Sequence, residues 1–76
     1  MSKPAIHTVP VKGGDGWTNE REGAGVVGET YATKAEAQAA GRDLARQDET
    51  EHIIHTQDGR ISERNSYGND PRSRPG

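Results

Sequence analysis

The sequence predicts an α+β fold, a small antiparallel sheet with one helix packed on one face, in the order β-β-β-α-β-β. Three observations predict it: β-branched stretches alternate with glycine-rich turns, one run of helix formers begins with a capping motif, and Asp-Gly separates the last two expected strands. A single helix of about 15 residues is roughly 22 Å long and covers one face of such a sheet. We therefore expect the other face to stay open.

Three strands are expected before the helix, in residues 6–11, 17–22 and 26–31. Pro10 lacks a backbone donor, which places it near an edge or at a strand end. The second stretch alternates, with Trp17, Asn19 and Arg21 on one face, as is typical of a half-buried strand, and Trp17 is most simply the core anchor. The third is weakened by Gly28. Glycine-rich turns at 13–16 and 23–25 connect the three.

The helix is the clearest element. Thr33 and Glu36 form a capping box, in which the threonine accepts a hydrogen bond from the amide of Glu36, and helix formers continue to Gln47. A narrow stripe of mostly small residues recurs at i, i+3, i+4 and i+7, comprising Ala37, Ala40, Gly41 and Leu44. Because these side chains have little volume, the helix backbone is expected to lie close to the sheet.

Two strands are expected after the helix, in residues 51–56 and 60–64, joined by a type I′ turn at Asp58 and Gly59. We place the single domain in residues 1–65 and an extended, partly mobile tail in 66–76. Tyr67 is the one large side chain of that tail, and we expect it either to pack against the domain or to contact a partner.

Composition limits both the core and the function. The chain has 76 residues, no cysteine, 28% hydrophobic residues and a net charge of −2. One small domain with a thin core follows, without disulfides, cysteine metal sites or a membrane-spanning segment. Charge is spread evenly along the chain, and no run of Lys and Arg predicts non-specific nucleic-acid binding. A cytoplasmic location is expected from the lack of cysteine and of an export signal.

Several motifs resemble those of one family. They are the runs His-Thr-Val-Pro at 7–10, Gly-Asp-Gly-Trp at 14–17, Arg-Glu-Gly-Ala at 21–24, Thr-Lys-Ala-Glu-Ala at 33–37, Asp-Gly-Arg-Ile at 58–61 and Asn-Ser-Tyr-Gly-Asn-Asp-Pro at 65–71. Together they resemble domain of unknown function 2188, a family of small bacterial and phage proteins. Asn19 stands where the resemblance implies a valine. The resemblance implies a fold and a bacterial or phage setting, but no activity and no site residues.

Histidines are the obvious metal-ligand candidates. His52 and His55 are three apart on one expected strand and so point to opposite faces, while His7 on another strand could approach one of them. Nothing in the sequence fixes such a geometry, and we expect no metal and no cofactor. The glycine-rich loops precede strands rather than helices, which argues against phosphate binding. No catalytic constellation is recognisable, so we expect no enzyme activity.

The sequence favours a small non-enzymatic binding module that acts through protein–protein contacts, as an inhibitor or adaptor, with a homodimer as one form. An open sheet face and two sheet edges motivate this hypothesis. The alternative is nucleic-acid binding through C-terminal arginines, since alternation would place Arg60 and Arg64 on one face of the last strand. The candidate partner-binding residues are Arg60, Arg64, Tyr67, Arg72 and Arg74.

Overall fold

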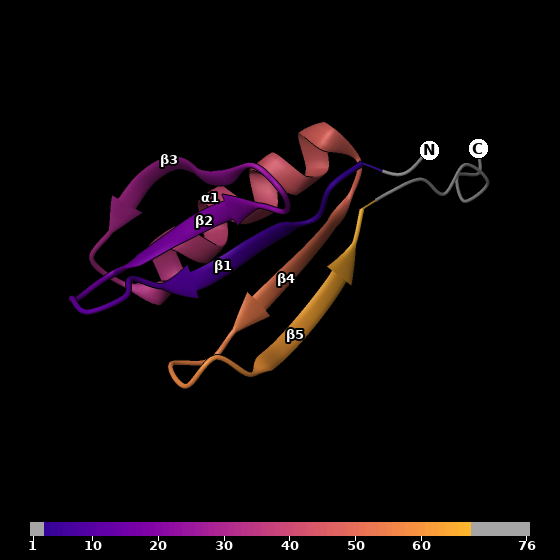
Figure 1. The fold of residues 1–76 in the computed structure, drawn as a ribbon. Helices are drawn as coiled ribbons and strands as arrows, with labels where there is room; N and C mark the ends of the chain where they lie inside the picture. The colour runs from indigo at the N-terminus through magenta and orange to yellow at the C-terminus, as the bar shows by residue number, and fades with distance from the viewer. Residues whose placement is uncertain (1–2, 68–76) are drawn as a thin grey trace.

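A computed structural model describes residues 3–67 of the chain. Its elements follow the predicted order: β1 (Ile6–Pro10), β2 (Trp17–Arg21), β3 (Gly25–Tyr31), α1 (Lys34–Asp48), β4 (Glu51–His55) and β5 (Ile61–Ser66). The strands form one five-stranded sheet, and the helix lies across one of its faces (Figure 1). The predicted α+β class is confirmed.

The strand order is β3-β2-β1-β4-β5, and the sheet is mixed rather than antiparallel. β1 and β4 run parallel in the centre, with Ile6 opposite His52 and Thr8 opposite Ile54. The other three pairings are antiparallel. The expectation of a wholly antiparallel sheet is wrong at this pair because α1 is a crossover connection. The helix carries the chain back toward the end of the sheet where β3 begins, so β4 runs in the same direction as β3. β1 also runs in that direction, and β1 and β4 are therefore parallel.

Local sequence accounts for both ends of α1. The Thr33 hydroxyl accepts a hydrogen bond from the amide of Glu36 at 3.2 Å, as the capping box predicts. The helix ends at Glu49, which has left-handed backbone angles (φ 55°) and donates its amide to the carbonyls of Ala45 and Arg46. This is the usual geometry of a helix C-terminus, occupied here by glutamate instead of glycine.

The Asp-Gly turn also departs in detail from the prediction. Gly59 has a positive φ of 91°, whereas Asp58 does not, so the turn is not type I′. The Gly59 amide donates to the Thr56 carbonyl, and the Thr56 amide donates to the Arg60 carbonyl. A type I turn followed by a left-handed glycine is the common three-residue hairpin loop.

Two contacts fix the ends of the helix on the sheet. Near the start of α1, the Lys34 ammonium lies 5.3 Å from the ring centroid of Trp17, which is buried as expected. Near its end, Asp48 accepts hydrogen bonds from Nε and Nη2 of Arg21 at 3.3 and 2.9 Å. Both contacts reach β2, so the helix is held along the length of that strand.

The middle of the helix rests on a buried polar network. Ala37, Gly41 and Ala45 are the buried positions of α1, while the other two residues of the expected stripe, Ala40 and Leu44, are half-buried. Beneath them lie three almost completely buried polar side chains, namely Thr8, Asn19 and His52. The core therefore contains polar groups where a thin apolar core was expected.

The donor and the acceptor of each hydrogen bond in this network can be assigned. Asn19 Nδ2 donates to the helix carbonyl of Ala37 at 3.0 Å, which turns Asn19 Oδ1 toward Thr8. The Thr8 hydroxyl donates to that oxygen at 2.6 Å. Its only proton is then used, so Nε2 of His52, 2.7 Å away, must donate to the Thr8 oxygen. Each of the three side chains thus has at least one hydrogen bond, which lowers the cost of burying it.

Gly41 is the residue that lets the helix approach this network. A Cβ at position 41 would lie 2.5 Å from Asn19 Oδ1, 2.7 Å from His52 Nε2 and 2.8 Å from Thr8 Oγ1. These three atoms are buried and hydrogen-bonded to one another, so they have little freedom to move aside.

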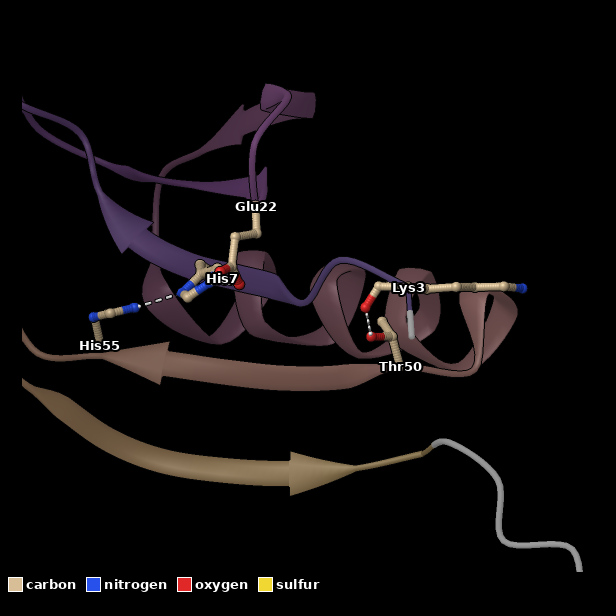
Figure 2. A network of polar contacts seen from close by, with 5 residues as sticks. All are labelled: Lys3, His7, Glu22, Thr50 and His55. Atoms are coloured by element: carbon tan, nitrogen blue, oxygen red, sulfur yellow. Dashed lines mark hydrogen bonds and ion pairs between the residues drawn. The ribbon is translucent and has the colours of Figure 1, made fainter. Parts of the chain in front are cut away.

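Thr50 joins three parts of the chain at the far end of the sheet. Its amide donates to the Ala45 carbonyl, its hydroxyl donates to the Lys3 carbonyl at 2.9 Å (Figure 2), and its own carbonyl accepts from the Tyr67 amide at 3.1 Å. The start of the chain, the end of α1 and the segment after β5 are thereby tied together.

We predict that Gly41→Ala destabilises the protein. Alanine improves helix propensity by about 1 kcal/mol, but overpacking a tight core costs about 1–3 kcal/mol and each broken buried hydrogen bond about 1 kcal/mol more. The melting temperature should therefore fall, by roughly 4–8 °C per kcal/mol lost. Ala39→Gly on the exposed side of α1 is the control for propensity. An unchanged or raised melting temperature for Gly41→Ala would contradict the packing described.

His52 should make the stability depend on pH. Burial of the ring, then the positive charge of Arg42, holds the pKa of His52 below its ordinary value of 6.5, with Glu63 acting in the opposite direction. The unfolded chain therefore takes up this proton more readily than the folded one. The contribution of His52 to stability is full above about pH 6.5 and is lost as the pH falls toward the folded-state pKa.

Urea denaturation between pH 7.5 and 5 should show this loss in the native protein. In His52→Gln, which keeps a donor for Thr8 but does not titrate, the dependence should be shallower. Equal pH dependence in the two proteins would show that His52 is not the titrating group.

Candidate binding face

The side of the sheet that faces away from α1 is called the open face here. The register assigns to it His7 and Val9 of β1, and side chains from the other strands that follow the same alternation: Thr18, Glu20, Val26, Thr30, Ile53, His55, Ile61 and Arg64. Ile53 is nearly buried by its neighbours, whereas the edge strands leave Val26 59% and Ile61 52% exposed. Aliphatic surface is thus concentrated near both edges of the open face.

A hollow of about 880 Å³ lies at one end of this face. Its lining comes from the end of β1 and the turn after it, from the middle of the sheet, and from the β4–β5 turn. Val9, Val11 and Val26 supply its apolar wall, and Thr18, Glu20 and His55 supply polar groups. The open face therefore offers a shallow groove of mixed character rather than a flat surface.

β5 is the most exposed strand of the sheet. Within residues 3–67, α1 contacts β1, β2, β3 and β4 but does not reach β5 (Figure 1). Residues 61–64 are all exposed, so this strand is bare on both faces and pairs only with β4. It contains no proline, which would block backbone pairing at this edge, although it does contain the charged residues Glu63 and Arg64.

The two arginines of the β4–β5 hairpin do not lie as alternation predicts. Arg60 precedes β5, with Nε 3.9 Å from Oδ2 of Asp58 at the exposed turn. A shift in register opposite His55 pairs that residue with Ile61, while Ile53 pairs with Arg64. The bulge interrupts the alternation at Ser62, and the argument for one face shared by Arg60 and Arg64 is wrong.

The other candidate residues lie at or beyond the far end of β5. Tyr67 is half-buried, and its amide is bound to Thr50, which agrees with a docked position for its backbone. Arg72 and Arg74 lie outside the described residues.

The side chains of His7, His55 and Glu22 form a cluster on the open face. The sequence predicted only that His7 could approach one of the other histidines. Nδ1 of His7 lies 2.9 Å from Nε2 of His55, and the two rings stack with centroids 5.1 Å apart. Nε2 of His7 lies 3.2 Å from Oε1 of Glu22 (Figure 2), and Nδ1 of His55 lies 3.4 Å from the Gly59 carbonyl. The prediction that His52 and His55 point to opposite faces of the sheet is confirmed. Of the two, His55 is the histidine that His7 approaches.

The surroundings of this cluster are acidic. Glu20 lies directly across from His7 on β2, and both line a second hollow of about 410 Å³ together with Glu22 and His55. Among residues 3–67, no three His, Asp or Glu side chains converge on one position that would hold a metal ion. The helix in this part of the chain is neither long nor apolar enough to span a membrane.

One family matches the chain, over residues 6–67: domain of unknown function 2188, described as an uncharacterised protein conserved in bacteria. Comparison with the curated proteins and with the solved structures finds no match. The matched range begins with β1 and ends one residue after β5, so it covers every element of the fold. This protein therefore belongs to the bacterial DUF2188 family.

Proposed function

We propose that this protein is a small non-enzymatic binding module that contacts another protein through the open face and the adjoining edge strand β5. The observation that carries the proposal is the exposure of β5: residues 61–64 are exposed, and about half of the surface of Ile61 is in solvent. A strand that is free on both faces and along one edge can take a partner by backbone pairing and by side-chain contact at once.

The rest of the open face supports the same surface. Val26 on the opposite edge is more exposed than Ile61, and the hollow lined by Val9 and Val11 lies between the two edges. Exposed aliphatic side chains around a shallow groove, surrounded by Glu20, His55 and Arg64, have the composition of a modest protein interface with a polar rim. An inhibitor or adaptor role would use this surface.

Site-specific photo-crosslinking tests the proposal. A photoreactive amino acid is placed at position 26 or 61 on the open face, or at position 39 on the exposed side of α1 as the control. In bacterial cells we expect the same protein adduct from positions 26 and 61 and none from position 39. An adduct of twice the chain mass would identify the partner as a second copy.

Affinity measurement with the captured partner completes this test. Ile61→Glu should weaken binding at least tenfold, or about 1.4 kcal/mol, because it puts a charge in the contact, whereas Ala39→Glu should not change it. Adducts from position 39 alone would contradict the proposal. A nuclease-sensitive adduct, with salt-dependent DNA binding that Arg64→Ala reduces, would replace it with the nucleic-acid alternative.

A further inference from the structure

The two histidines on the open face have acceptor oxygens at their outer nitrogens. The Glu22 carboxylate faces Nε2 of His7, and the Gly59 carbonyl faces Nδ1 of His55. An acceptor oxygen favours a proton on the nitrogen that it faces, and a neutral imidazole has only one such proton. With the protons on both outer nitrogens, the two inner nitrogens, Nδ1 of His7 and Nε2 of His55, would both present lone pairs.

These inner nitrogens lie only 2.9 Å apart. Two lone pairs that face each other at this distance repel, so without a metal ion one ring carries its proton on the inner nitrogen and donates to the other. The long 3.4 Å contact of His55 to the Gly59 carbonyl makes Nε2 of His55 that donor. Two imidazole ligands on one tetrahedral zinc, with Zn–N bonds of 2.0–2.1 Å, would be about 3.3 Å apart. Separation by a few tenths of an ångström, with a tilt of both rings toward a common point, would give these nitrogens the spacing of two metal ligands.

The outer contacts are those that metal-binding histidines use. A carboxylate or a backbone carbonyl that accepts from the second ring nitrogen fixes the tautomer and orients the ring. The site also opens into the hollow of about 410 Å³ that Glu20 and Glu22 line, which leaves room for water ligands and adds negative charge. Arg21 lines the same hollow, but its charge is paired with Asp48.

We propose that His7 and His55 form a surface site for a divalent transition-metal ion such as Zn²⁺, in which two bonds to the ion replace the hydrogen bond between the two imidazoles. Glu22 positions His7, and water molecules complete the coordination. This site shares His55 with the rim of the proposed partner surface, but its ligands do not include any group from a partner.

NMR of the untagged full chain tests the site directly. Zn²⁺ titrated at neutral pH should shift the imidazole resonances of His7 and His55 and leave those of His52, buried on the other face, unchanged. Shifts of all three histidines or of none would overturn the proposal.

Variants give the matching affinities. His7→Gln and His55→Gln should each raise the zinc dissociation constant at least tenfold, and Glu22→Gln about tenfold if it acts on His7 from outside the coordination sphere. His52→Gln is the matched control and should bind zinc like the native protein. Circular dichroism checks that each variant is folded. Equal zinc affinity in the native protein and a variant lacking both His7 and His55 would refute the site.

Discussion

The structure depends on the close contact between the backbone of α1 at Gly41 and the buried Thr8–Asn19–His52 network. With so few large apolar residues, the chain cannot hold its helix on the sheet by side-chain volume alone. It instead presents small residues, lets the helix backbone approach closely, and uses directed hydrogen bonds to fix the position. One of these bonds, from Asn19 to the Ala37 carbonyl, joins sheet and helix directly.

This position of the helix determines which surfaces remain free. α1 lies over β1, β2 and β4, between its contacts to Trp17 and Arg21, and does not extend to β5. The β4–β5 hairpin consequently projects from the sheet, held by the ladder to β4 and by the bond between Tyr67 and Thr50. The proposed binding surface and the histidine pair both follow from a single helix that covers only one face.

Local patterns predicted the elements well, because caps, turns and alternation act over a few residues. The Thr33 capping box and the buried Trp17 are examples. The parallel pairing of β1 with β4 was missed, since it depends on a crossover that joins distant segments. Asn19 departs from the resemblance, yet it is a buried, hydrogen-bonded core residue. The sequence could not predict this role, because its two partners lie on two other elements, β1 and α1.

The candidate site was less predictable than the fold. A one-residue bulge at Ser62 cannot be read from a strand of ordinary composition, and it invalidated the face assigned to Arg60 and Arg64. The approach of His7 to a second histidine was foreseeable, but the acceptors at the outer nitrogens were not. Glu22 and the Gly59 carbonyl come from turns whose placement only the assembled sheet determines.

The tautomer of His52 is the most direct measurement of the central network. Because the Ala37 carbonyl orients Asn19, and Asn19 takes the hydroxyl proton of Thr8, Nε2 of His52 must carry a proton. The ¹⁵N chemical shifts of the imidazole at pH 7.5 should therefore show a neutral ring protonated at Nε2 and bare at Nδ1. A ring protonated at Nδ1 alone, or a doubly protonated ring, would contradict the network and the close approach of the helix that rests on it.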